Sequence, residues 1–345
     1  MKVVVASTVL PFTSGGGTLI AEWLQRALEA HGHQVEHYAI PFFSDPLTMA
    51  QQMVGLRLVD LEGQADRVVA IRTPSYLLRH PQKSVWFIHH HRPAYDLWDT
   101  PMRDVLDDPE GRERRRMTMQ SDKVALGESR RLFANSVVMK ERLRSFNGLD
   151  AEVLYPPLPL GVPYRCDDYG DALVMVSRIT AHKRQLLAVQ AMTHVQSDAR
   201  LVLAGQVNDP AHAQLLRRAI VDHGLADRVT VLDRWIGEQE KLDLLARCRA
   251  VVYVPLDEDS YGYTALEAAR CSKAVVTTHD AGGVLELVSD GVNGLVTDPT
   301  PTALAAAFDR LYDEPGLAEQ MGEAGPQRIA ELGVDWEHVL QRLLT

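Results

Sequence analysis

The sequence has few cysteines and no long apolar run. Its three cysteines, Cys166, Cys248 and Cys271, lie far apart. That number and spacing fit neither a disulfide framework nor a metal-binding motif, so a reducing cytoplasm is the expected location. No segment approaches 18 uninterrupted apolar residues, and the opening MKVVVASTVLPF has no small-residue cleavage site of a signal peptide. We therefore expect a soluble cytoplasmic protein without a membrane span.

An excess of basic charge is also absent. The 345 residues include 36 Lys and Arg against 46 Asp and Glu. The first 160 residues contain 19 of each kind, so the surplus of acid lies in the second half. Nucleic acid is not an expected partner, because binding to its phosphates needs a net basic surface. Hydrophobic content of 46% and charged content of 24% are ordinary for a folded protein and exclude a disordered or fibrous chain.

The sequence does contain an alternation of short β-branched runs and amphipathic helical segments. In the first half, runs such as KVVVAST and SVWFIHH alternate with TLIAEWLQRALEAHGH and with a long charged helix from about Pro109 to Ser129. A proline-rich linker follows at 154–171, and the alternation then restarts at ALVMVSR. Two helical segments, PTALAAAFDRLYDE and WEHVLQRLL, finish the chain. This α/β pattern predicts two doubly wound parallel sheets that face each other across a cleft, with ligands at the carboxyl ends of the strands.

The stretch DEDSYGYTALEAARC places acids on both sides of a glycine turn. Three acids at 257–259 follow the expected strand AVVYVPL, and Glu267 lies inside the helix that comes next. Gly262 permits a tight turn into that helix, whose positive end suits a phosphate. Side chains of a helix lean toward its amino end, so Glu267 can reach the same place. The acids either frame one small ligand or stabilise the start of the helix.

Two cations follow the first strand of the second half, in VSRITAHKR. Arg178 leaves the strand, and Lys183 stands at the start of the next helix. A guanidinium fork and an ammonium group placed together can hold an anion. The alternative is a pair of solvated surface side chains.

A glycine triplet, Gly15, Gly16 and Gly17, lies between the first strand and the first helix. Backbone at such glycines can approach a ligand closely. The triplet is not a good dinucleotide fingerprint, because Ile20 stands where glycine or alanine is required.

Three histidines, His89, His90 and His91, close the strand SVWFI. Consecutive residues at a strand end point in alternate directions and seldom converge on one ion, so a metal site is not predicted. His89 is favoured as a site residue, whereas a structural role is as readily expected for His90 and His91.

The basic run GRERRRM lies at 111–117. It either meets an anionic membrane or acceptor, or forms the solvated face of a helix. In the second case the acids Glu110, Glu113 and Asp122 would balance its charge.

The order of these motifs resembles the retaining glycosyltransferases of family 4, which have the GT-B fold. The resemblance covers nearly the whole chain, through SGGGT, SRITAHK, the SYGY-xxLEA block, DAGGVLELVSDGVNGLV and a closing Trp-Glu helix. In the family the acidic block is Glu, seven residues, Glu. Here Asp259 occupies the first position and Glu267 the second, while Glu258 stands one residue away and could take the first role.

The GT-B resemblance implies two Rossmann-like domains. Residues 1–160 would form an acceptor-side domain and residues 161–327 a domain that binds a nucleotide-sugar donor. The last helix, at about 328–345, would pack back on the first domain.

The resemblance also implies an activity: transfer of a hexosyl-type sugar from a nucleoside diphosphate sugar to an acceptor hydroxyl, with retention and without a metal or other cofactor. Arg178 and Lys183, with the glycine backbone, would neutralise the diphosphate. The first acid would hold the donor sugar, Glu267 would bind the ribose, and His89 would line the sugar or acceptor side.

Further donor contacts are implied along the acidic loop and at the strand end expected to face the base: Glu258, Ser260, Tyr261, Gly262, Tyr263, Thr264, Arg234, Trp235 and Ile236. Asp280, Gly282 and Gly283 resemble the family's glycine turn beside the donor.

The expected acceptor is a small molecule, a glycan or a lipid-linked molecule, with membrane contact at most peripheral. Three alternatives remain open. A sugar-nucleotide epimerase can share the architecture, a nicotinamide-dependent oxidoreductase would use the glycine turn, and a nucleotide-sugar-binding protein would have no turnover.

Overall fold

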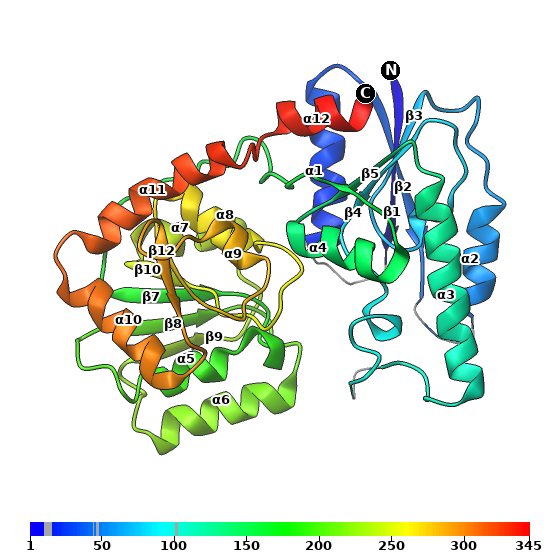
Figure 1. The fold of residues 1–345 in the computed structure, drawn as a ribbon. Coiled ribbons are helices and arrows are strands. Elements are labelled where there is room, and N and C mark those ends of the chain that lie inside the picture. The colour runs from blue at the N-terminus through cyan, green and yellow to red at the C-terminus, as the bar shows by residue number, and fades with distance from the viewer. Residues whose placement is uncertain (10–15, 44, 46–47, 101–102) are drawn as a thin grey trace. The chain divides into compact units, whose positions relative to one another are not determined.

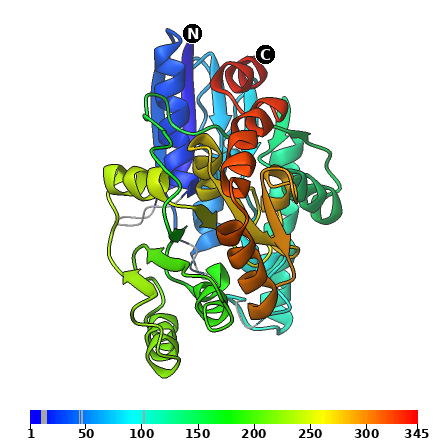
Figure 2. The same ribbon diagram turned by 90° about the vertical axis from the view of Figure 1, so that its left-hand side faces the viewer.

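The computed structural model describes residues 1–9, 16–43, 45, 48–100 and 103–345. The chain separates into two compact units, each of which appears as a layered α/β ribbon (Figures 1 and 2). Unit 1 comprises Met1–Gly161 and Val334–Thr345, and unit 2 comprises Val162–Gly333. The chain therefore passes between the units twice, once within the predicted proline-rich linker.

Unit 1 is built on a six-stranded parallel sheet of order β2-β1-β3-β4-β5-β6. The strands are β1 Lys2–Val9, β2 Gln34–Pro41, β3 Arg67–Ala70, β4 Lys83–Phe87, β5 Arg131–Ala134 and β6 Glu152–Val153. The α-helices are α1 Gly16–Ala30, α2 Met49–Arg57, α3 Pro109–Gly127, α4 Val137–Arg142 and α12 Trp336–Leu344. Short 3₁₀ turns lie at Ser75–Leu77 and Arg92–Ala94, and a π-helical turn at Leu143–Asn147 extends α4.

Strand β4 shows how helices cover both faces of this sheet, since successive side chains point to opposite faces. On one face, Val85 and Phe87 join the apolar core that includes residues of α2, α3 and α4. On the other face, the Trp86 ring meets the Trp336 ring of α12 edge-on, with centroids 6.3 Å apart. Helix α12 thus covers the face of the sheet opposite α3.

Unit 2 contains a second six-stranded parallel sheet, of order β12-β11-β10-β7-β8-β9. Its strands are β7 Ala172–Val176, β8 Arg200–Ala204, β9 Val229–Leu232, β10 Ala250–Val252, β11 Ala274–Thr278 and β12 Gly294–Thr297. Its α-helices are α5 Gln185–Ala191, α6 Pro210–Asp222, α7 Glu238–Arg247, α8 Tyr263–Arg270, α9 Val284–Leu287, α10 Pro301–Asp313 and α11 Leu317–Glu331, and a 3₁₀ turn lies at Ala181–Lys183.

Each sheet has one point at which the direction of strand succession reverses. In unit 1 it lies between β1 and β3, and in unit 2 between β7 and β10. Loops that leave two neighbouring strands there diverge to opposite faces, which opens a crevice where ligands of such folds bind. The predicted parallel, doubly wound architecture is confirmed.

Among the described residues, three α-helices were not predicted. Helix α2 lies before the third strand, the short α9 lies between β11 and β12, and α11 lies between the two helical segments expected at the end of the chain. The closing helix, Trp336–Leu344, is the predicted segment WEHVLQRLL, whereas the start expected near residue 328 falls within α11.

Candidate active site

The reversal point of the unit 2 sheet holds a cluster of three polar side chains. Lys183 stands in the turn after β7, whereas Tyr253 and Glu258 follow β10. The Lys183 ammonium forms an ion pair with the Glu258 carboxylate and donates a 2.9 Å hydrogen bond to the Tyr253 hydroxyl, which itself donates to Glu258 at 3.1 Å. Burial acts to raise the pKa of Glu258, but the charge and hydrogen bond of Lys183, together with the hydrogen bond from Tyr253, outweigh burial and hold that pKa below its ordinary value.

Arg178 stands at the same end of the sheet, on the loop after β7. Its side chain is exposed, and within the described part of the chain no carboxylate forms an ion pair with it. Its positive charge acts to lower the pKa of Tyr253, which burial raises. Gln185 fixes the loop by donating to the Ser177 hydroxyl at 3.0 Å and to the Arg178 carbonyl at 2.8 Å. The two cations predicted from VSRITAHKR therefore both follow β7 at the same end of the sheet.

The acidic loop lies against the predicted glycine turn. Glu258 N–H donates to the Ala281 carbonyl at 3.2 Å, and Gly283 N–H donates to the Glu258 carbonyl at 2.9 Å. Glu258, rather than its neighbour Asp259, is the acid that pairs with Lys183. Asp259 and Ser260 are half-buried on the same loop. The turn is anchored by Asp280, whose carboxylate accepts two hydrogen bonds from Arg184, at 2.9 and 2.6 Å.

Helix α8 starts from this loop at Gly262, which has φ +73°. A Cβ at this position would come within 2.2 Å of the Tyr253 ring, so both the backbone conformation and the space require glycine. Tyr261 is fully buried, which leaves only its backbone to meet a ligand. Tyr263 is half-buried, and the Thr264 hydroxyl donates to the Val176 carbonyl of β7 at 2.9 Å.

The first turn of α8 has no side-chain cap among the described residues. Its N–H groups therefore remain suited to an anion at the end of the helix dipole.

Glu267 is buried in α8 and is paired across helices. Lys241 of α7 lies 2.5 Å from its carboxylate and 3.1 Å from that of Glu238. Burial raises the pKa of Glu267, although Lys241 opposes the rise. Lys241 was not predicted, because nothing in the local sequence of α7 indicates the contact.

The predicted base-binding residues follow β9, in the segment that leads to α7. Arg234 forms a two-point ion pair with Glu240 at 2.8 and 2.5 Å. Trp235 is 67% exposed and so is not a core residue, while Ile236 is half-buried. An exposed indole has a face on which a planar ring could stack.

The three consecutive histidines after β4 diverge. The His89 Nδ1 lies 2.7 Å from the His90 carbonyl, His90 Nε2 lies 2.7 Å from the Asn147 amide oxygen, and His91 Nε2 lies 2.6 Å from Asp104. Burial lowers the pKa of His90 to about 4, so that ring is neutral at physiological pH. No three His, Cys, Asp or Glu side chains of the described chain gather closely enough to hold a metal ion.

The predicted glycine triplet is only partly described. Gly15 lies outside the described residues, whereas Gly16 begins α1 and Gly17 follows it. A Cβ at Gly17 would come within 2.7 Å of the Arg72 side chain, so the glycine backbone and this side chain are closely packed.

The basic run belongs to α3, and two of the three acids expected to balance it do so. Glu110 pairs with Arg114 and Glu113 with Arg116, each at 2.6 Å. The prediction for Asp122 is wrong. Its carboxylate is fully buried and accepts a 2.7 Å hydrogen bond from the Tyr95 hydroxyl, because α3 turns that position toward the sheet.

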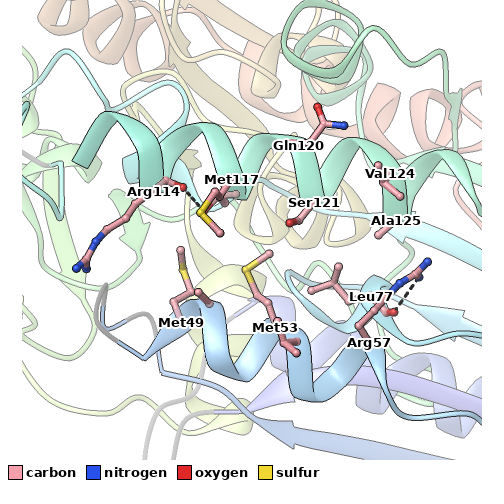
Figure 3. A pocket seen from close by; sticks show the side chains of 13 residues that line it. Met49, Met53, Arg57, Leu77, Arg114, Met117, Gln120, Ser121, Val124 and Ala125 are labelled. Atoms are coloured by element: carbon pink, nitrogen blue, oxygen red, sulfur yellow. Dashed lines mark hydrogen bonds between the residues drawn. The ribbon is translucent and has the colours of Figure 1, made fainter. Parts of the chain in front are cut away.

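An apolar groove of 320 Å³ lies between α2 and α3 (Figure 3). Its walls include Met49, Met53 and Met117, and two arginines, Arg57 and Arg114, lie at its edge. Both arginines are paired, to Glu128 at 2.5 Å and to Glu110 at 2.6 Å. Among the described helices, none has the length and apolar character needed to cross a bilayer.

The fold, with two parallel sheets that each have one reversal point, is that of GT-B glycosyltransferases. The structure of Anabaena HepE in complex with UDP and glucose superimposes with a TM-score of 0.70 at 19% identity, covering 99% of this chain and 98% of that one. Sucrose-phosphate synthase from Thermosynechococcus elongatus gives a TM-score of 0.74 at 17% identity, covering 99% and 97%. These likenesses confirm the predicted fold class.

Residues 167–328 match the sequence profile of the family described as "Glycosyl transferases group 1", which confirms the resemblance predicted from the motifs. Human alpha-1,3/1,6-mannosyltransferase ALG2 is 28% identical over 219 residues, which cover 57% of this chain and 52% of that protein. Alpha-maltose-1-phosphate synthase of Mycobacterium tuberculosis is 33% identical over 218 residues, covering 57% and 54%. The match thus spans about half the length of these relatives.

Proposed function

We propose that this protein transfers a hexosyl-type sugar from a nucleoside diphosphate sugar to an acceptor hydroxyl, with retention of configuration and without a metal ion. The observation that carries the proposal is the convergence of Lys183, exposed Arg178 and the uncapped start of α8 at one reversal point. Three groups that favour negative charge there suit a departing diphosphate. The HepE structures contain UDP and UDP-glucose, which supports a donor of this kind.

In this proposal unit 2 holds the donor. Arg178 offers a guanidinium fork to the diphosphate and Lys183 a point charge, so the charge that develops on the leaving group meets fixed cations. Glu267, held by Lys241, accepts hydrogen bonds from the ribose, and the loop at 258–264 contacts the sugar hydroxyls. Trp235 and its neighbours Arg234 and Ile236 contact the base.

Unit 1 holds the acceptor, a small molecule, glycan or lipid-linked hydroxyl compound, with His89 lining the sugar or acceptor side. The leaving phosphate assists removal of the proton from the acceptor hydroxyl, and the new bond forms on the face from which the diphosphate departs. Exclusion of water from the reacting atoms protects the donor from hydrolysis.

A thermal-shift screen against UDP, GDP, dTDP, ADP and NAD, each with and without EDTA, tests donor binding. A ligand at about 100 times its Kd should add about 2.7 kcal/mol of stability. We expect one nucleoside diphosphate to raise the Tm and EDTA to leave that rise unchanged. A response to NAD alone, or to no nucleotide, would overturn the proposal.

A second assay separates transfer from the other activities of such folds. The sugar nucleotide of the base identified by the screen is incubated with and without a panel of acceptors, and products are followed by NMR. Transfer yields an α-linked product from an α-linked donor, together with free nucleoside diphosphate. Conversion of the sugar nucleotide with no acceptor present would indicate an epimerase, and binding without any product would indicate a binding protein.

A further inference from the structure

A second pocket, of 320 Å³, lies at the reversal point of the unit 1 sheet. Thr8 at the end of β1, Arg72 and Thr73 after β3, and His89 and Arg92 after β4 contribute to its wall. Carboxyl ends of neighbouring parallel strands on either side of a reversal point are where α/β folds place ligands. The position alone therefore marks the pocket as a binding site of unit 1.

The described wall of this pocket contains basic and hydroxyl side chains and no carboxylate. Arg92 is compensated by Asp96 at 2.6 Å, and His91 by Asp104 at 2.6 Å. Buried His90 is neutral because of its low pKa. Arg72 is the cation of the wall for which the described residues supply no acid.

The hydrogen-bond donors of the Arg72 guanidinium are also poorly satisfied. Its Nη1 donates two long hydrogen bonds, to the Thr8 carbonyl at 3.3 Å and to the Thr18 hydroxyl at 3.4 Å. Its Nε is buried and has no partner within the described structure. Removal from water lowers the pKa of this guanidinium, which means that its charge is held at a cost. Gly17 packs directly against it.

A half-buried guanidinium with open donors is well suited to bind an oxyanion at two points. We propose that Arg72 and the pocket around it bind a phosphate group carried by the acceptor, so that the acceptor of this enzyme is an anionic, phosphorylated molecule. This inference rests on the proposed function, because it names the class of acceptor. The donor diphosphate has its own cations in unit 2, Arg178 and Lys183.

The test is isothermal titration of the full chain with inorganic phosphate, at constant ionic strength set with chloride. Arg72→Gln removes the charge, and Arg72→Lys keeps it without the fork. Arg79→Gln is the matched control, since Arg79 is an exposed arginine of the same unit that precedes β4 rather than following a strand. Thermal unfolding of each variant verifies that it is folded.

We expect phosphate binding to weaken by at least about tenfold in Arg72→Gln, because a hydrogen bond to a charged group contributes about 1.5 to 3 kcal/mol. Arg72→Lys should weaken it less, and Arg79→Gln should leave it within about twofold, since an exposed distant charge is screened. Equal phosphate affinity in Arg72→Gln and wild type, or no phosphate binding by wild type, would overturn the proposal.

A parallel titration with the nucleoside diphosphate that stabilises the wild type identifies the source of the phosphate. If Arg72→Gln weakens the binding of phosphate but not of the nucleotide, the pocket serves the acceptor. If it weakens nucleotide binding by the same factor, the pocket binds a phosphate of the donor and the acceptor assignment is wrong. Failure of the proposed function is distinct, because then no nucleoside diphosphate binds to the wild type at all.

Discussion

Replacing Lys183 with methionine should separate the stabilising role of this residue from its role in ligand binding. The substitution keeps the aliphatic stem but leaves Glu258 without its cation, and the Glu258 side chain is only 23% exposed. Breaking a buried ion pair by removing one partner costs about 3 to 5 kcal/mol. Because Glu258 retains some contact with water, we expect a loss of about 2 to 4 kcal/mol, which corresponds to a fall in Tm of roughly 5 to 15 °C.

The double variant Lys183→Met/Glu258→Gln is the matched control, since it removes both charges and keeps the shape of both side chains. Urea unfolding should show that the double variant regains most of the stability that Lys183→Met loses. Affinity for the nucleoside diphosphate, measured by titration calorimetry, should instead stay at least about tenfold below wild type in both variants, because the cation is absent from both.

The pH dependence gives a further check with a defined sign. In the wild type the pKa of Glu258 is held low, so its contribution to stability is present above the ordinary pKa of a glutamate and is lost as pH falls through the lowered value. In Lys183→Met the charge and hydrogen bond of Lys183 are lost, and burial is opposed by the Tyr253 hydrogen bond and the His182 charge, so the pKa of Glu258 rises relative to wild type. The gap between wild type and variant should therefore widen from pH 4 to pH 7. A double variant as unstable as the single one, or with wild-type nucleotide affinity, would refute the reasoning.

Three other outcomes are expected. Burial raises the pKa of Asp122 from 3.8 to about 6, so the folded state holds this proton more tightly than the unfolded state and loses stability as pH rises through 6. Relative to Asp122→Asn, the wild type should lose about 1.4 kcal/mol of unfolding free energy between pH 5 and pH 7.5. Urea titrations check this, and an equal dependence on pH in both proteins would contradict it. Glu267→Gln should weaken nucleoside diphosphate binding at least about tenfold but leave pyrophosphate binding unchanged, because only the former carries a ribose; parallel losses for both ligands would exclude a ribose contact. Gly262→Ala should cost about 1 to 3 kcal/mol, since it combines a positive φ with a clash against Tyr253, and calorimetry that shows wild-type stability would contradict the described turn.

The parallel sheets could be predicted because buried strands and amphipathic helices alternate with little interruption. The same reasoning placed Arg178 and Lys183 at a strand end, and the acidic loop at another, because parallel strands bring their carboxyl ends to one edge. What could not be predicted was which strands are neighbours. The pairing of β7 with β10 unites Lys183 with Glu258, 75 residues away along the chain.

The features that were wrongly predicted or not predicted have similar physical causes. Helix α11 contains Gly322, Gly325 and Pro326, which disfavour a helix in isolation, yet a Cβ at Gly322 would come within 2.0 Å of the Ser272 carbonyl. Close packing of α11 against its neighbours in unit 2 therefore overrides its low propensity. Asp122 appeared to balance a basic helix because charge pattern alone does not show which face of α3 is turned inward.

The return of the chain to unit 1 has a consequence for how the protein is made. The Trp336 indole donates to the Leu158 carbonyl at 2.8 Å, and the Ser84 hydroxyl donates to the Leu343 carbonyl at 2.9 Å, so unit 1 needs residues from both ends of the sequence. Unit 2, which is continuous, has all its residues once Gly333 has left the ribosome. During synthesis the first unit to begin is thus the last to be completed, and until then one face of its sheet lacks α12 and exposes Trp86 to premature association with other chains.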